Sequence, residues 1–316
     1  MPSITAAYGM RRLRTAYTGS ILRIRRSSDN TEQDIGYTAT GDLDTSAIST
    51  FIGGGNGYIV NWYDQSGNAY TASQSTTANQ PLYVASGQNG GPIGRWDTTD
   101  RLLMSVNLAQ PHTYLIANSV SSGYPRIVDG QNNAGNIGFY DANNSYVMWS
   151  GAVALVGSAP YYGASILVPF FQGVSSTLYR NGALLGTVSP STNSVVGMQL
   201  LEQGDRYELI IANTAWSTSD RQTAEAISNA YWAVYSVTAP VRDTTTTYSS
   251  SAGSAKIVTP AASYNYTQAV NVGDTNTYNL SAYAYTDGTT VTSADAELFY
   301  NGSTVSTTYT SVGSGW

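Results

Sequence analysis

The side chains that could carry out acid–base or nucleophilic chemistry are few. The 316-residue chain has no cysteine and one histidine, His112, against 20 aspartates and glutamates. A thiol nucleophile, a disulfide framework, an iron–sulfur cluster and a cysteine-ligated zinc site are therefore excluded. With no second histidine to share a metal, we expect a structural role for His112. Carboxylates are then the candidates for catalysis, and turns, helix caps or arginine pairing account for most of them.

A run of aromatic residues followed by polar turn residues permits two interpretations. The run is WYDQSGN at 62–68. In the first interpretation, Trp62 or Tyr63 stacks on a sugar ring while Asp64 and Asn68 bond its hydroxyl groups. In the second, which we favour, Asp64 caps the N–H groups of its own loop in an Asx-turn. The candidate ligand-binding residues are Trp62, Tyr63, Asp64, Asn68, Asn136 and Tyr140.

Two loops, at 129–135 and 140–144, are rich in oxygen ligands. Ca²⁺ prefers about six to eight oxygens, and the candidates here are Asp129, Asn133 and Asp141. The spacing lacks the terminal bidentate glutamate of an EF-hand loop. We therefore favour ordinary turn chemistry and expect no cofactor, with calcium as the alternative.

Six arginines cluster near the N-terminus: Arg11, Arg12, Arg14, Arg23, Arg25 and Arg26. A basic cluster can bind phosphate or nucleic acid. Alternate side chains of a strand face opposite sides, however, so the cluster is expected to be divided between two faces. We expect structural ion pairing or a subunit contact, with anion binding as the alternative. The nearby acidic partners are Asp29, Glu32, Asp34, Asp42 and Asp44.

Short alternating or β-branched runs separated by turn residues predict a sandwich over 1–237. The predicted strands are 21–26, 58–63, 113–117, 136–140, 145–149, 166–171, 176–180, 183–188 and 207–213. Asn181-Gly182 predicts a type I′ hairpin, because both positions of that turn need positive φ. Helices are predicted at 44–52, capped by Asp44 or Thr45 and ended by Gly53, and at 217–232.

The composition favours an extracellular β-rich protein. Charged residues make up only 11% of the chain, and the net charge of −6 argues against nucleic-acid binding. No apolar stretch approaches the roughly 20 residues that cross a bilayer. The N-terminus lacks the pattern of a secretory signal, so we expect release by another route or by lysis. The excess of tyrosine over phenylalanine, 25 to 5, suits an exposed sheet, an interface or a surface that stacks on sugars.

Composition also divides the chain. Residues 238–255 are rich in threonine and serine without an apolar period, which is typical of a linker. Residues 256–316 resume strand patterning with turns at Asp287-Gly288 and Asn301-Gly302. They predict an immunoglobulin-like β module with few strands completed before Trp316.

The N-terminal segments 8–19 (YGMRRLRTAYTG), 22–30 (LRIRRSSDN) and 62–68 (WYDQSGN), with Gln74, resemble the opening of the arabinofuranosidase B catalytic domain. That opening is also similar to phage tail and virion-surface proteins. Segments 178–182 (LYRNG) and 208–213 (ELIIAN) resemble the closing strands of laminin-G-like modules. The resemblance implies a concanavalin A-like jelly-roll sandwich over 1–237. For the arabinofuranosidases it implies cleavage of terminal α-L-arabinofuranosyl residues with retention.

The family's catalytic carboxylates lack matching residues here. A retaining glycosidase needs a nucleophile and an acid/base. The family's nucleophilic glutamate matches Gly138 in the segment 134–140, and its acidic aspartate matches the carboxylate-free segment 195–200. Asp141, Glu202 and Asp205 lie nearby in sequence and form the fallback set. No catalytic residue is therefore assigned with preference.

Together these observations predict a non-enzymatic virion-surface protein: a phage tail, fibre or capsid-decoration component that binds carbohydrate or a host surface. Its expected partners are other virion proteins, further copies of the chain and a cell-surface glycan, with no nucleic acid and no membrane insertion. The expected location is the virion surface. The alternative is a retaining α-L-arabinofuranosidase with displaced carboxylates.

Overall fold

Antiparallel strands build the N-terminal part of the protein. The computed structural model describes residues 4–236 except 121, 124, 133, 140–145 and 157–161, together with short strand segments between 253 and 305. The chain divides into two compact units, at Met1–Tyr235 and Ser236–Gly315. The predicted module over 256–316 lies mostly outside the described residues, as do Tyr140 and Asp141.

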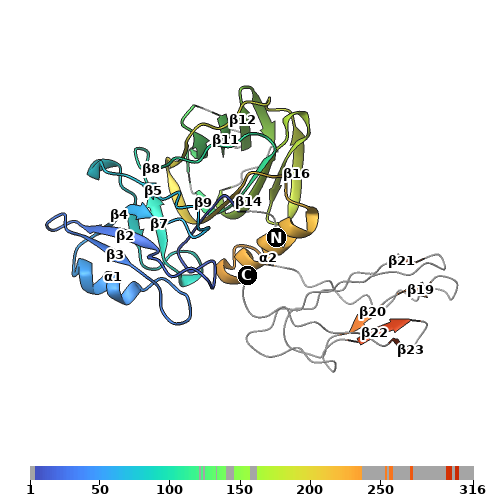
Figure 1. Cartoon of the computed structure of the whole chain (residues 1–316), viewed down its shortest axis with the longest axis horizontal. Helices are drawn as coiled ribbons and strands as arrows, with labels where there is room; N and C mark the ends of the chain where they lie inside the picture. The colour runs from blue at the N-terminus through green and yellow to red at the C-terminus, as the bar shows by residue number, and fades with distance from the viewer. Residues whose placement is uncertain are drawn as a thin grey trace. The chain divides into compact units, whose positions relative to one another are not determined.

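Two series of paired strands form most of the first unit. The first runs β1 (Ala6–Gly9), β18 (Gly204–Ala212), β9 (His112–Val120), β14 (Gly163–Phe171), β15 (Ser176–Arg180) and β16 (Ala183–Val188). The second runs β8 (Arg101–Met104), β17 (Met198–Leu201), β10 (Arg126–Gly130), β11 (Ala134–Phe139), β12 (Tyr146–Ser150) and β13 (Val153–Val156). Figure 1 shows both series curving around a common interior.

A third group of strands connects the two series. It comprises β2 (Leu22–Arg26), β3 (Glu32–Ile35), β4 (Gly57–Trp62), β5 (Ala72–Ser73), β6 (Leu82–Val84) and β7 (Ile93–Trp96). β7 pairs with β18 and β5 pairs with β8, so strands β1 to β18 form one continuous antiparallel sheet. The interior is apolar, and Ile116, Met148 and Leu200 are fully buried in it. The prediction of a β-rich chain is confirmed.

The two helices begin where the cap residues predict. α1 spans Thr45–Ile52, with the Asp44 carboxylate accepting from the Ala47 N–H, and Gly53 ends it at φ 60°. α2 spans Thr218–Trp232, with the Ser217 hydroxyl accepting from the Asp220 N–H. Three short 3₁₀ turns lie at η1 (Thr77–Asn79), η2 (Gln88–Gly90) and η3 (Gly173–Ser175). Neither helix, nor any other in the described part of the chain, is long and apolar enough to span a membrane.

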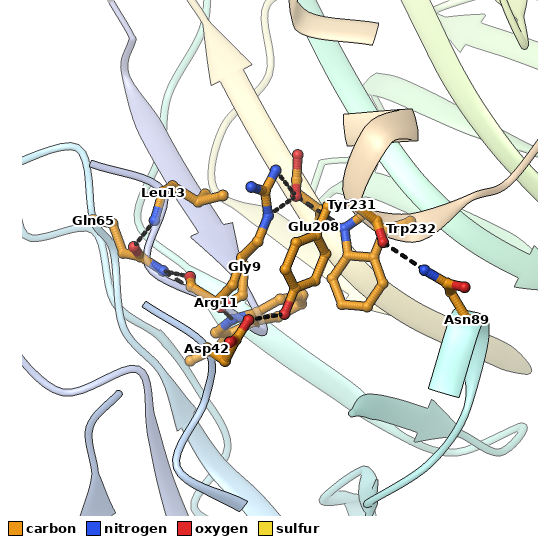
Figure 2. A network of polar contacts seen from close by, with 10 residues as sticks. Gly9, Arg11, Leu13, Asp42, Gln65, Asn89, Glu208, Tyr231 and Trp232 are labelled. Carbon is orange, nitrogen blue, oxygen red and sulfur yellow. Dashed lines mark hydrogen bonds and ion pairs between the residues drawn. The ribbon is translucent and has the colours of Figure 1, made fainter. Parts of the chain in front are cut away.

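A buried polar network joins α2 to the sheet (Figure 2). Glu208 on β18 accepts from Arg11 Nη2 at 3.1 Å and from Trp232 Nε1 at 3.0 Å. The Tyr231 hydroxyl donates to Asp42 at 2.7 Å, and Asn89 Nδ2 donates to the Tyr231 carbonyl at 2.9 Å. Because these bonds come from segments far apart in sequence, they fix the helix on the sandwich.

The arginine cluster is used structurally. Arg23 pairs with Asp34 and Arg26 with Asp29, each through two hydrogen bonds of 2.6–2.8 Å. Arg11 pairs with Glu208. The prediction of ion pairing is confirmed for these three arginines.

In the C-terminal unit the described strands are β19 (Gly253–Ser254), β20 (Lys256–Val258), β21 (Asn271–Val272), β22 (Glu297–Tyr300) and β23 (Ser303–Val305). β19 pairs with β21, and β22 pairs with both β20 and β23, all antiparallel.

Candidate active site

A carboxylate, Asp129, lies on the strand between the two where the resemblance places the catalytic residues. β10 pairs on one side with β11, which carries Gly138, and on the other with β17. Asp129 is directly opposite Gln199 on β17. Neither β11 nor β17 contains an acidic residue. The central strand therefore brings a carboxyl group to a position that its neighbours leave without one.

One guanidinium bridges Asp129 to a second carboxylate. Arg126 Nη1 donates to Asp129 Oδ2 at 2.9 Å, and Nη2 lies 2.8 Å from Glu202 Oε1. Arg126 also donates from its Nε to Oε1 at 2.9 Å and from its backbone N–H to Oε2 at 2.7 Å. Asp129 is fully buried, whereas the side chains of Arg126 and Glu202 are 41% and 27% exposed. Of the two carboxylates, Asp129 is therefore buried and Glu202 is partly exposed.

The two carboxylates are positioned by different local structure. Asp129 is held on a regular strand, whereas Glu202 occupies the turn between β17 and β18 at φ 59°. Its backbone N–H donates to the Asp100 carbonyl at 3.1 Å, which fixes the turn against the start of β8.

Burial controls the proton affinity of Asp129. Desolvation raises the pKa of this carboxyl to about 6, although Arg126, the Gly130 N–H and Asn136 all act to lower the pKa. A carboxyl that keeps its proton near pH 6 can act as a general acid. Glu202, open to solvent, can approach a ligand directly.

A second carboxyl group with a raised pKa, that of Asp100, lies at the same end of the sheet. Burial, aided by the charge of Asp97, raises the pKa of Asp100 to about 6. Its Oδ2 accepts from the Asp97 N–H at 2.8 Å. Neither Asp100 nor the Arg126 bridge is apparent from the sequence, because no motif surrounds these residues. Asp129 is suggested there only as a calcium ligand.

The side chains of the aromatic segment at 62–68 bond and pack against other protein groups. Trp62 is fully buried, packs between Tyr8 and Trp96, and donates to the Gly9 carbonyl, so it has no exposed face for a sugar. Asp64 accepts from the N–H groups of Ala7, Ser66 and Tyr70. This is the Asx-turn of the second interpretation.

The other two residues of that segment also bond protein groups. The Tyr63 hydroxyl donates to Asp34 at 2.7 Å, and Asn68 Nδ2 donates to the Ile4 and Thr5 carbonyls. All four candidates of this segment therefore bond protein groups, and among the candidate sugar ligands in the described part of the chain Asn136 contacts Asp129.

The remaining predicted site residues have other positions. Asp205 pairs with Arg95 at 2.7 Å on the β18–β7 ladder. Of the calcium candidates, Asp129 bonds Arg126, while Asn133 and Asp141 lie outside the described residues. His112 is buried against Tyr114 and Phe171, and burial lowers its pKa to about 4, so it is neutral near pH 7. Within the described part of the chain, no three histidine, aspartate or glutamate side chains gather to hold a metal.

Comparison with known proteins gives both a family and a fold. Residues 1–163 match the model of the catalytic domain of alpha-L-arabinofuranosidase B. A GH54 α-L-arabinofuranosidase soaked with a cyclic sulfate inhibitor superposes with a TM-score of 0.57 at 17% identity, covering 81% of this chain and 68% of that one. An arabinofuranosidase complexed with arabinofuranosyl-α-1,2-xylobiose gives 0.56 at 17% identity with the same coverage. At such identity the likeness establishes the fold. No curated protein sequence matches the chain.

Proposed function

Because the chain belongs to the family of α-L-arabinofuranosidase B catalytic domains, we propose that it is a glycoside hydrolase that removes terminal α-L-arabinofuranosyl residues from glycans. The observation that carries this proposal is the pair of carboxylates on either side of the Arg126 guanidinium. Two carboxyl groups are what glycoside hydrolysis requires, and their differing environments suit two different roles.

In the proposed mechanism Glu202 is the nucleophile and Asp129 the acid/base. The partly exposed Glu202 carboxylate attacks the anomeric carbon, while the protonated Asp129 gives its proton to the departing glycosidic oxygen. Asp129 then takes a proton from the water that releases the sugar from Glu202. A pKa of about 6 lets one carboxyl serve both steps.

Arg126 controls access in this scheme. Asp129 has no exposed surface. The side chain of Arg126, whose guanidinium bonds Asp129, is 41% exposed. A substrate reaches Asp129 only when Arg126 turns away from it. In this scheme the two catalytic carboxylates are not at the matching positions, Gly138 and 195–200, but on β10 and in the β17–β18 turn. Asp205, which the sequence also offered as a candidate, has no catalytic role.

The prediction of a non-enzymatic virion-surface protein is wrong. The match to the arabinofuranosidase B catalytic model and the superposition on GH54 arabinofuranosidases favour the hydrolase alternative. The resemblance to laminin-G-like modules and phage proteins finds no support in these matches. Two finer parts of the fold prediction remain proposals: the concanavalin A-like jelly-roll topology of residues 1–237 and the immunoglobulin-like character of 256–316.

Release of 4-nitrophenol from 4-nitrophenyl α-L-arabinofuranoside tests the function. We expect Glu202→Gln to lower kcat/KM by about 10²-fold or more, because the nucleophile is lost. Asp129→Asn should lower kcat/KM by about 10²-fold on an arabinofuranosyl oligosaccharide, whose departing hydroxyl needs a proton, and by less on the nitrophenyl substrate, whose leaving group departs without one. Asp205→Asn, a carboxylate-to-amide change outside the pair, should leave the rate within a factor of two. A wild-type chain that releases no nitrophenol, or an Asp129→Asn variant with full activity on the oligosaccharide, contradicts the proposal.

A further inference from the structure

A shallow hollow of about 370 Å³, lined mostly by uncharged polar residues, lies at the end of β10 away from Glu202, where this strand turns into β11. Its lining residues are Ser105, Asn107, Gln131, Asn132, Val196 and Gly197. They come from the segment after β8, the β10–β11 turn and the segment before β17. Each of these described lining residues is uncharged.

Hydrogen bonds between the three segments hold the rim of the hollow in place. Asn132 donates to the Ser194 carbonyl at 2.9 Å and accepts from the Val196 N–H at 3.0 Å. The Gly197 N–H donates to Asn107 Oδ1 at 2.8 Å, and the Gln131 N–H donates to the Gly197 carbonyl at 3.0 Å. A rim fixed in this way needs little ordering when a ligand binds.

Several polar groups of the rim are left for a ligand. The bonds above use Asn107 through its oxygen alone, so its amide NH₂ is available, as is the side-chain amide of Gln131. Gly197 makes room for that amide: at φ 63°, a Cβ there would lie 2.6 Å from Gln131 Nε2. Val196, 57% exposed, adds an apolar surface beside these groups.

We propose that this hollow binds one uncharged sugar unit. Amide groups of Asn107 and Gln131 bond ring hydroxyls, and Val196 contacts the apolar C–H face of the ring. Uronic acids and other anionic sugars are disfavoured, since no cation among the described lining residues pairs with a carboxylate.

The hollow is near Asp129, the proposed acid/base, and at the opposite end of β10 from Glu202, the proposed nucleophile. Gln131 follows Asp129 by two residues, at most roughly 7 Å of extended chain. The bound unit is therefore a neighbour, in the glycan, of the arabinofuranosyl residue that is cleaved. This last assignment rests on the proposed function, whereas binding in the hollow does not.

Titration of the 316-residue protein with xylobiose, followed by saturation-transfer NMR, tests the proposal. We expect xylobiose to bind, Gln131→Ala to weaken its Kd at least fivefold, and digalacturonate to bind at least tenfold more weakly. Gln33→Ala, an exposed glutamine on β3, is the matched control and should bind xylobiose like the wild type. Filling the hollow by Ser105→Trp should weaken binding as well.

These measurements test the sugar-binding hollow and the proposed hydrolase function separately. Xylobiose binding that depends on Gln131 supports the hollow even if no nitrophenol is released, in which case the proposed function alone is wrong. Absence of xylobiose binding, equal binding by wild type and Gln131→Ala, or a preference for digalacturonate overturns the hollow whatever the hydrolysis assay gives.

Discussion

Two arginine–carboxylate clusters in the same unit differ in how they are enclosed. Around Glu208, which is 2% exposed, Trp232 is buried and Arg11 is only 14% exposed (Figure 2). Around Arg126, by contrast, the fully buried Asp129 is joined to an exposed guanidinium and the partly exposed Glu202.

The difference teaches which carboxylates are free to react. Glu208 is bonded to groups from the end of β1 and from α2, so moving it disturbs the attachment of the helix. Arg126 and Glu202 border solvent, and their movement costs little packing. Burial alone is therefore a poor guide to function here, because both clusters hold a buried carboxylate. The exposure of the arginine partner distinguishes them, at 14% for Arg11 and 41% for Arg126.

The largest contrast is expected in stability. Glu208→Gln removes the charge that compensates Arg11, which is only 14% exposed. Breaking a buried pair in this way costs about 3 kcal/mol, whereas Glu202→Gln at an exposed pair costs about 1 kcal/mol or less. Urea unfolding followed by tryptophan fluorescence measures both. Equal losses for the two variants would show that the clusters are not different in kind.

The pH dependence of hydrolysis sharpens the contrast. An acid must be protonated to act, so kcat/KM should fall as pH rises through the Asp129 pKa of about 6. Arg126→Gln removes the positive charge that lowers this pKa. The alkaline limb should then move upward by about one pH unit. Asp205→Asn is the control, and its kcat/KM profile should keep the wild-type alkaline limb. If Arg126→Gln also leaves this limb unchanged, the proposed role of Asp129 is contradicted.

Local signals predict local structure well in this chain. Asn181 and Gly182 do have positive φ, of 53° and 82°, as the type I′ hairpin requires. Asp44 and Ser217 cap the two helices because their side chains bond N–H groups three residues later. These features depend on a few consecutive residues, which the sequence displays directly.

The candidate active site could not be found in the same way. Arg126 and Glu202 are 76 positions apart and meet only because β10 pairs with β17 in one register. A shift of one residue in that register would move Asp129 to the other face. Trp62 failed as a sugar ligand for a similar reason, since an aromatic residue in a strand can face the core or the solvent. Alternation alone does not decide which.

A moderate effect is expected at Asp100. Its folded pKa of about 6 exceeds the ordinary value of 3.8, so between these values the folded state keeps a proton that the unfolded state has lost. Stability must then fall as pH rises through this window, and the penalty is complete at pH 7. Asp100→Asn keeps an acceptor for the Asp97 N–H and removes the charge. It should raise the free energy of unfolding by about 1–2 kcal/mol at pH 7 and by nothing at pH 3. Urea titrations at both pH values measure this, and a gain at pH 3 alone contradicts it.

The smallest effect is expected at the Arg95–Asp205 pair, which resembles the Arg126 cluster in geometry but lacks its buried carboxylate. The pair is bonded at 2.7 Å with side chains 52% and 22% exposed. Solvent screens such a pair, and fixing two long side chains offsets much of the attraction. Asp205→Asn should therefore change the free energy of unfolding by no more than about 0.5 kcal/mol, with hydrolysis nearly unchanged. A loss as large as that of Glu208→Gln would mean that charge pairing, and not enclosure, separates the clusters.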